Sequence, residues 1–186
     1  TNSVADEVVF LTMEAYPFTY FSPNRISYKL FNFDTLSTGN DTTQRININM
    51  LNSSERTKAY PFEPFMGLVS IMDASLPTNE VLDIQGYKRY MVPNVYSNID
   101  LHYYSNQSDL KMYYVVKPGG DPALINWFID GATSNSIVAN KLEINGFNAK
   151  VVYDQPTVYQ VNPVGNPITL SGSASWQNVS ANTYSI

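Results

Sequence analysis

Apolar and polar residues alternate along several short stretches of the chain. The clearest alternation runs through residues 45–50, where polar residues separate Ile46, Ile48 and Met50. A period of two places successive side chains on opposite faces of an extended strand, so the pattern predicts a half-buried β-strand. Shorter apolar runs predict further strands at residues 7–11, 18–21, 26–31, 137–138, 141–144, 149–153, 158–161, 168–170, 174–176 and 184–186.

The strongest local pattern is a pair of apolar stretches in the middle of the chain. Residues 99–104 and 110–116 are rich in Ile, Leu, Val and Tyr, and the linker at 105–109 is polar. This pattern predicts a β-hairpin with a loop of five residues. Turn residues follow at 117–122, and the period of two at 125–129 favours a strand there over a capped helix.

The region before this hairpin is less regular. Pro61 and Pro64 remove backbone donors and restrict their predecessors, so residues 52–64 are predicted to form a loop. Residues 66–72 fit either a strand or a short helix, and residues 81–90 form a further apolar stretch. If the chain divides, the joint is expected at 92–96.

The fold class follows from these short strands and the residues between them. Gly, Pro and Asn punctuate the strands at the spacing expected of a sandwich. Aromatic residues make up 13% of the chain, led by 14 Tyr, which favours strands. We predict an all-β protein with an antiparallel β-sandwich in one module at 1–186. Two small sandwich-like subdomains in tandem, at 1–92 and 93–186, remain an alternative.

Charge and composition limit the kinds of partner that this chain is expected to bind. The net charge of −5 provides no basic surface for a run of phosphates, so no nucleic-acid partner is expected. No stretch approaches 18 consecutive apolar residues, so no membrane insertion is expected. The absence of cysteine is compatible with export to an oxidising compartment. The chain begins without the features of a signal peptide and looks mature or excised.

Few residues are candidates for chemistry. His102 is the only histidine, and the predicted strand places Asp100 and Tyr104 on its face. We interpret it as a structural histidine and expect no catalytic residue, no metal and no cofactor. A calcium site built from loops stays open, because oxygen ligands need not be adjacent in sequence. The scattered carboxylates that such a site would draw on include Asp34, Asp41, Asp73 and Asp121.

Aromatic residues supply one alternative function. Tyr103, Tyr113, Trp127 and Trp176 would stack on sugars if their rings were exposed. Large aromatic residues at strand spacing are more often part of a core. Glycan binding by surface aromatics is therefore an alternative hypothesis.

Several motifs in the second half of the chain resemble those of a known family. Residues 96–104 fit Y-x-x-I-D-L-x-Y-Y, and residues 116–122 fit V-x-P-G-x-D-P. Residues 125–132, 142–144 and 156–160 fit I-x-x-x-x-x-G-A, L-x-I and P-x-x-Y-Q. The chain resembles the β-rich N-terminal domain of unknown function that precedes SBBP-type β-propeller repeats in Bacteroidetes-type surface proteins.

The resemblance implies an exported, non-catalytic module, often in proteins with type IX secretion signals that serve surface display, adhesion or gliding. The expected location is extracellular or at the cell surface. The expected partners are other domains of the same parent protein, surface proteins or glycans, and a self-assembling filament or shell subunit is a second alternative. We interpret the motif residues as architectural: Ile99, Asp100, Leu101, Pro118, Gly119, Asp121, Pro122 and Gln160.

Overall fold

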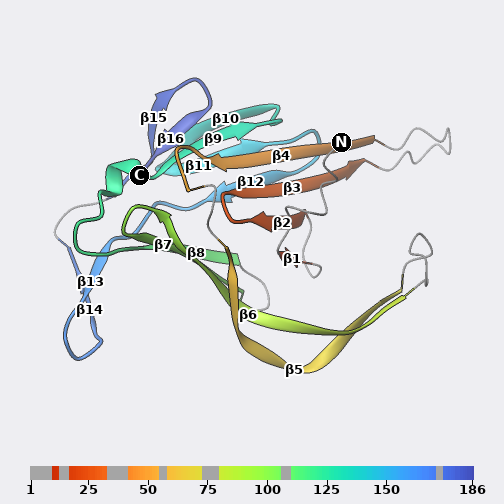
Figure 1. Ribbon diagram of the computed structural model, residues 1–186. Coiled ribbons are helices and arrows are strands. Elements are labelled where there is room, and N and C mark those ends of the chain that lie inside the picture. Colours follow the sequence, from red (N-terminus) through yellow and green to blue (C-terminus); the bar gives the residue numbers. More distant parts are fainter. Residues whose placement is uncertain are drawn as a thin grey trace. The chain divides into compact units, whose positions relative to one another are not determined.

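The fold is built from antiparallel β-strands. The computed structural model describes residues 10–12, 17–32, 42–54, 58–72, 80–105, 110–170 and 174–186 (Figure 1). Within these residues the regular structure is strand, apart from one short 3-10 helix at Pro122–Leu124. Neighbouring strands pair antiparallel throughout, which confirms the predicted all-β class.

The chain forms two compact units. Unit 2 is the continuous segment Ser54–Asp121, and unit 1 combines Thr1–Ser53 with Pro122–Ile186. The predicted joint at 92–96 instead lies within one strand, β6 (Glu80–Tyr96). A register shift between Val92 and Tyr96 marks the place, so the irregular pattern there reflects a β-bulge.

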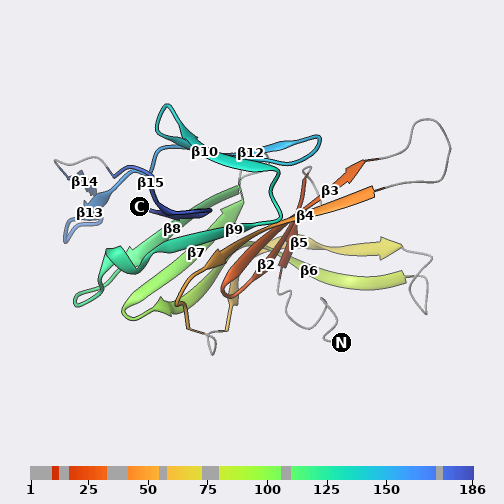
Figure 2. The same cartoon turned by 90° about the horizontal axis from the view of Figure 1, so that it is seen from above.

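A seven-stranded sheet forms the larger part of unit 1. Its middle strands lie side by side in Figure 2, and β4 pairs with β9 although many residues separate them in sequence. The strand order is β1 (Phe10–Thr12), β2 (Phe18–Ser22), β3 (Arg25–Asn32), β4 (Thr42–Met50), β9 (Asn126–Asp130), β16 (Thr183–Ser185), β15 (Gln177–Ser180).

Two smaller sheets complete unit 1. One has three strands, β10 (Ser134–Val138), β11 (Lys141–Asn145) and β12 (Lys150–Tyr153). The other is a two-stranded hairpin of β13 (Tyr159–Val161) and β14 (Pro167–Thr169).

The core of unit 1 lies between its two larger sheets. Tyr28 of β3 and Tyr153 of β12 share a hydrogen bond between their hydroxyl groups, and Asn148 Nδ2 donates to the carbonyl oxygen of Phe31. These contacts place the two sheets face to face, as in a sandwich. Each fully buried Ile or Leu side chain contributes about 1.5–3 kcal/mol to folding. The buried side chains include Ile26, Leu30, Ile46, Ile48, Trp127, Ile129, Leu142 and Ile144.

Unit 2 is a four-stranded sheet with the order β5-β6-β7-β8. It consists of β5 (Tyr60–Met72), β6, β7 (Ile99–Ser105) and β8 (Leu110–Val116). The predicted hairpin at 99–116 is confirmed, except that Ser105 pairs with Leu110 and so belongs to the strand. Residues 106–109 lie outside the described part of the chain.

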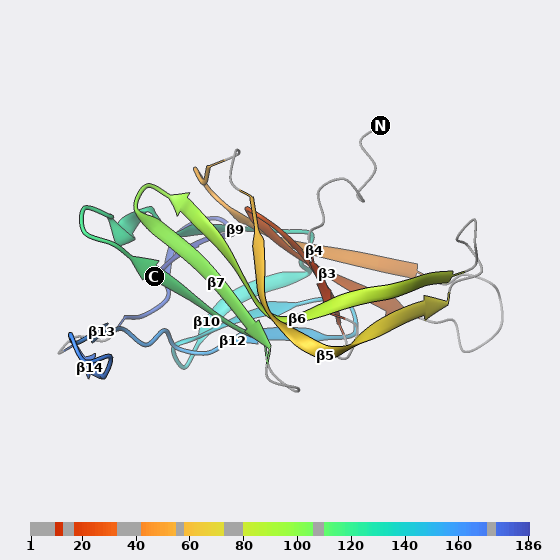
Figure 3. The same ribbon diagram turned by 60° about the horizontal axis from the view of Figure 1, so that its bottom comes forward.

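The prediction of a loop at 52–64 is wrong for its last residues, because β5 begins at Tyr60. Pro61 and Pro64 keep register with β6, opposite Tyr90 and Tyr87. An edge strand tolerates proline because one side of its backbone needs no ladder hydrogen bond. Beyond β7, the ribbon of β5 and β6 continues as a pair of strands (Figure 3).

Smaller differences concern strand ends. The stretch 174–176 is not a strand, since β15 begins at Gln177. The stretch 7–11 is described only from Phe10, where β1 begins. Residues 66–72 are part of β5 and not a helix. The strand predicted at 125–129 is confirmed as β9.

Candidate functional site

The two faces of the four-stranded sheet differ in character. On β7, Ile99, Leu101 and Tyr103 are almost completely buried. Asp100, His102 and Tyr104 alternate with them and lie on the opposite face, which we call the histidine face. The alternation in the sequence thus predicted both faces of this strand correctly.

Strand register extends the histidine face across the whole sheet. The pairing places Met91 of β6 opposite His102, and Tyr60 of β5 opposite Met91. On the other side, Tyr113 of β8 lies opposite His102. One row therefore crosses all four strands. A second row beside it contains Phe62, Arg89, Tyr104 and Lys111.

Ring contacts bind these two rows together. The rings of His102 and Tyr113 are stacked, with centroids 4.8 Å apart and planes inclined by 6°. Phe62 meets His102 edge to face, with ring centroids 6.3 Å apart. Such pairs contribute roughly 0.5–1.5 kcal/mol beyond the area that they bury. The His102 imidazole therefore contacts the Tyr113 ring of β8 on one side and the Phe62 ring of β5 on the other.

Arg89 adds a charged group to the second row. Its guanidinium lies 5.1 Å from the centre of the Tyr104 ring, and its Nε atom is 3.2 Å from Glu63 Oε1. Both partners of this ion pair are well exposed, so the pair itself contributes little to stability. The ion pair and the ring contact both keep the guanidinium beside Tyr104.

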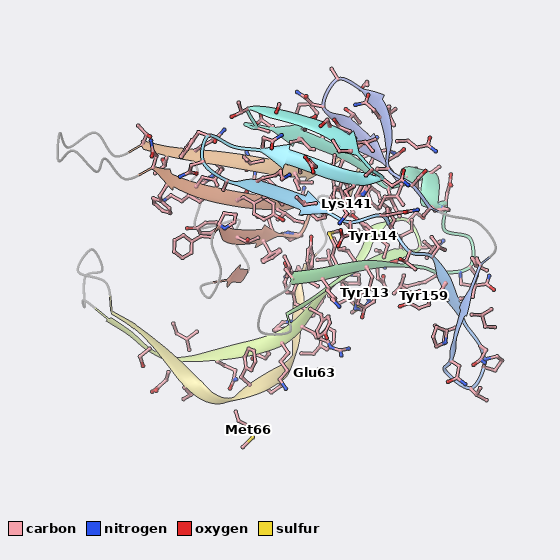
Figure 4. The ribbon with its side chains drawn as sticks, turned by 180° about the vertical axis from the view of Figure 1, so that it is seen from behind. Glu63, Met66, Tyr113, Tyr114, Lys141 and Tyr159 are labelled. Carbon is pink, nitrogen blue, oxygen red and sulfur yellow. The ribbon has the colours of Figure 1, made fainter. Side chains whose placement is uncertain are left out.

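The histidine face is accessible in part. Tyr60 is 52% exposed, and Phe62, Met91, His102, Tyr104 and Tyr113 are half-buried. Figure 4 shows Tyr113 and its neighbour Tyr114 leaving β8 on opposite sides. Aromatic residues, Met and Arg at a partly exposed surface are the composition typical of protein interfaces.

Asp100 performs a structural task at one end of this face. Its Oδ1 atom lies 2.6 Å from Lys117 Nζ and accepts the backbone N–H of Asn94 at 2.8 Å. Burial raises the pKa of the Asp100 carboxyl. The hydrogen bonds from Lys117 and Asn94, with the charges of Lys117 and His102, outweigh burial and leave the pKa below its usual value. The carboxylate thus joins the bulge of β6 to the residue after β8.

The surroundings of His102 disfavour the charged form of its imidazole. Burial lowers the pKa of its imidazole, Asp100 opposes that effect, and Arg89 and Lys117 lower the pKa further. Its Nδ1 atom is buried, without a hydrogen-bond partner among the described residues. The carboxylate of Asp100 is bonded to Lys117 and Asn94, so it does not orient the imidazole as in a catalytic triad.

The turn that follows β8 explains the two glycines at 119 and 120, within the segment that fits V-x-P-G-x-D-P. Gly119 has a φ of 82°, a left-handed conformation that side chains disfavour. A β-carbon on Gly120 would lie 2.8 Å from the carbonyl oxygen of Asn98. Pro118 and Asp121 are exposed, and Pro122 opens the 3-10 helix that leads into β9.

Most of the aromatic residues considered for sugar stacking are in the core. Tyr103 and Trp127 are 1% exposed and Trp176 is 7% exposed, so their rings have no open face for a sugar. Trp127 packs against Trp176 and Tyr153, with ring centroids 4.9 Å away in each case. Of the four residues, Tyr113 alone is half-exposed, and its ring is stacked on His102.

The remaining candidates lie apart from the histidine face. Gln160 is exposed in β13, opposite Ile168. Asp121 is exposed, while Asp34, Asp41 and Asp73 fall outside the described residues. Within the described ranges, no group of three or more His, Cys, Asp or Glu residues is placed to hold a metal ion.

Sequence reasoning missed part of the histidine face. The prolines beside Tyr60 and Phe62 predict a loop, and Met91 has no distinct sequence pattern. The signal that identifies the first two is alternation itself, since Tyr60 and Phe62 are two residues apart and therefore share a face of β5.

Fold and surface together define a class of antiparallel β-rich modules with one half-exposed, ring-rich sheet face. The family model described as "Domain of unknown function (DUF7948)" matches residues 2–173, and the chain belongs to this family. Neither the curated proteins nor the solved structures gave a significant match. Among the described residues, no helix is long and apolar enough to cross a membrane.

Proposed function

We propose that this chain is a non-catalytic structural and interaction module of a larger exported bacterial surface protein. Its location in the parent is before SBBP-type propeller repeats, at the cell surface or outside the cell. The motifs at residues 96–104 and 116–122 support this context through their resemblance to such N-terminal domains. Sequencing of the gene beyond Ile186 tests the context, and an unrelated enzyme domain in place of repeats would contradict it.

The observation that carries the proposal is that the polar groups of the histidine face, Asp100 and His102, are engaged in structural contacts. Asp100 holds the bulge of β6 and the residue after β8 in place, and the His102 imidazole packs against the rings of Phe62 and Tyr113. General acid–base catalysis needs a titratable group within reach of a reacting proton. On the histidine face, Asp100 and His102 instead contribute to packing and strand connection, which supports a structural role.

The interaction part of the proposal rests on the partly exposed rings of the histidine face. Tyr60, Phe62, Tyr104 and Tyr113 lie on one face of the four-stranded sheet, with Arg89 among them. Tyr and Arg are enriched among the residues that carry most of the binding energy in protein interfaces. We propose another domain of the parent, or a neighbouring surface protein, as the partner of this face.

Photo-crosslinking in the intact parent protein on cells tests the interaction. A benzophenone side chain at Tyr60 is expected to capture a protein segment reproducibly. The matched control is the same group at Val138, an exposed apolar residue of β10 in unit 1. Equal, unspecific products from both positions would contradict the proposed surface.

Protease treatment of intact cells tests the proposed location, because a surface module is cut while cytoplasmic markers stay whole. The non-catalytic character is tested separately with the purified chain. Hydrolytic turnover of a polysaccharide or peptide substrate that Asp100→Asn and His102→Gln both abolish would overturn it.

A further inference from the structure

An aromatic cluster of Trp127, Tyr153 and Trp176 lies in the core of unit 1. The ring centroids of Trp127 and Trp176 are 4.9 Å apart. The ring centroid of Tyr153 lies 4.9 Å from that of Trp127 and 6.2 Å from that of Trp176. The sequence contains two tryptophans, so both indole rings of this chain belong to the cluster. An electron can therefore pass between either indole and one phenol over a contact distance.

A fourth ring, that of Tyr28 in β3, is joined to the cluster through its hydroxyl group. The hydroxyl oxygens of Tyr28 and Tyr153 are 2.5 Å apart and share a hydrogen bond. Burial raises the pKa of the Tyr28 hydroxyl to about 12, although the bond to Tyr153 opposes this effect. An unperturbed tyrosine has a pKa of about 10, so Tyr28 holds its proton more tightly. Its hydroxyl is suited to donate a hydrogen bond to the Tyr153 oxygen.

These contacts define where a missing electron would come to rest. At neutral pH a phenol reduces an oxidised indole ring, loses its hydroxyl proton and becomes a neutral phenoxyl radical. The phenol that reacts must therefore release its proton. Tyr153 is half-buried, whereas Tyr28 is buried and holds its proton tightly. Of the two hydroxyl groups, that of Tyr153 is the better proton source.

We propose that Tyr153 is a redox-active tyrosine that collects one-electron oxidation of unit 1. A small oxidising radical takes one electron from Trp127 or Trp176 and becomes an anion. Tyr153 then gives one electron to the oxidised indole, its phenolic proton goes to water, and the indole returns to its original state. The net change is the loss of one electron and one proton from Tyr153. In the oxidised state Tyr28 donates its hydrogen bond to the Tyr153 oxygen.

Tyr184 of β16 is a competing electron donor, because it lies opposite Trp127 in the neighbouring strand. Its side chain is almost completely buried, and its hydroxyl donates to Asn135 Oδ1 at 2.6 Å. A neutral amide oxygen is a weak base, and burial disfavours a charged product. The phenolic proton of Tyr184 therefore leaves less readily than that of Tyr153. This makes Tyr184 a matched control.

The redox role of Tyr153 goes beyond the proposed function, and the two can fail independently. The interaction surface proposed above is the histidine face of unit 2, whereas the aromatic cluster lies within unit 1. An electron transfer that does not occur would leave the crosslinking result at Tyr60 untouched. A missing partner for the histidine face would equally leave the transfer to Tyr153 intact.

Pulse radiolysis of the purified chain in azide solution measures the transfer. The azide radical oxidises indole rings in preference to phenols at neutral pH, and it leaves as the azide anion. We expect the absorption of the indolyl radical to decay while that of the phenoxyl radical rises. The rate should be first order and independent of protein concentration, because the step occurs within one chain. An indolyl radical that decays without a phenoxyl signal would overturn the proposal.

A phenylalanine substitution identifies the phenol that reacts. Tyr153→Phe keeps a ring in the cluster and is expected to abolish the first-order phase, because the electron donor is gone. Tyr184→Phe is the matched control and should retain the phase. Circular dichroism confirms that both variants are folded. Retention of the phase in Tyr153→Phe, or its loss in Tyr184→Phe, would assign the radical to another residue.

Tyr28→Phe provides a second readout that leaves Tyr153 in place. A hydrogen bond to a phenoxyl oxygen shifts the g-value of the radical in high-field electron paramagnetic resonance. We expect the shifted value in wild type and the value of an unbonded phenoxyl radical in Tyr28→Phe. Identical spectra for the two proteins would refute a radical at Tyr153 that Tyr28 stabilises.

Discussion

Asp100 joins three parts of unit 2 at the scale of a single residue. Its carboxylate accepts a hydrogen bond from the bulge of β6 at Asn94 and forms an ion pair with Lys117, just beyond β8. The residue itself lies on β7, so one side chain fixes all three strands at the same end. A buried carboxylate in this position is favourable because both partners compensate for its loss of water.

Asp100→Asn is expected to lower the free energy of unfolding by about 1–3 kcal/mol at neutral pH, since the amide forms no ion pair. A carboxyl whose pKa is lowered by folding contributes stability above its unfolded pKa of about 3.9, and that stability is lost as the pH falls toward the folded value. The difference between wild type and variant should therefore shrink below about pH 4. Urea unfolding at pH 7 and pH 3 measures this, with the exposed Asp130→Asn as control.

His102 gives a second residue-scale prediction, at higher pH. Because its pKa is lowered in the folded chain, the unfolded chain binds the proton more tightly, and stability falls as the pH drops below about 6.5. His102→Phe keeps a ring against Tyr113 without the titration. Its urea midpoint should change less between pH 7.5 and pH 5.5 than that of wild type. Parallel changes in both proteins would assign the pH dependence to other groups.

At the scale of elements, an aromatic cluster joins one strand from each of the two larger sheets of unit 1 to the segment before β15. Trp127 of β9 contacts Tyr153 of β12 and Trp176, and Trp176 Nε1 donates to the carbonyl oxygen of Asp154 at 2.9 Å. These residues are distant in sequence, so the cluster forms only when the sheets come together. Its rings close one part of the core between the two sheets.

Trp176→Ala removes a large buried ring and its hydrogen bond, and is expected to lower the free energy of unfolding by about 3–5 kcal/mol. Val179→Ala is the matched control. Val179 lies three residues further along and is well exposed, so its effect should stay within about 0.5 kcal/mol. Urea denaturation followed by circular dichroism measures both. Similar small effects for the two variants would show that the cluster is not part of the stabilising core.

At the scale of the whole molecule, unit 2 is an insertion between two neighbouring strands of unit 1. The end of β4 and the start of β9 are paired, Met50 with Trp127, and the backbone N–H of Leu51 bonds to the carbonyl oxygen of Asn126. The chain therefore enters and leaves the insertion Ser54–Asp121 at the same end of the β4–β9 pair. Unit 1 thus depends on pairing between two distant segments, which is slower to form than a local hairpin.

A chain in which a short Gly–Ser turn replaces residues 54–121 is expected to fold, because the turn connects β4 and β9 as an ordinary antiparallel pair. Both tryptophans of the protein lie in unit 1 and are buried, so their fluorescence reports its core. The shortened chain should show the emission of buried tryptophan and a cooperative thermal transition. Emission typical of solvent-exposed tryptophan would mean that unit 1 needs the insertion.

The sequence by itself determined which segments are strands wherever alternation was regular. The runs at 45–50 and 99–104 are strands with the predicted faces buried, because the period of two is a local property of extended backbone. The glycines at 119 and 120 likewise indicated a tight turn without reference to distant residues. The same reasoning separated the two faces of β7, and with them half of the candidate surface.

Only the tertiary structure decided what depends on contacts between distant residues. Pro61 and Pro64 occur in a strand because β5 lies at an edge, and no local pattern distinguishes an edge from a loop. Trp127 and Trp176 are core residues because a second sheet covers them. The sequence pattern of a strand is the same whether such a ring faces a second sheet or water. The pairing of β4 with β9, and so the division into two units, depends on contacts between distant segments. Local sequence patterns do not reveal such contacts.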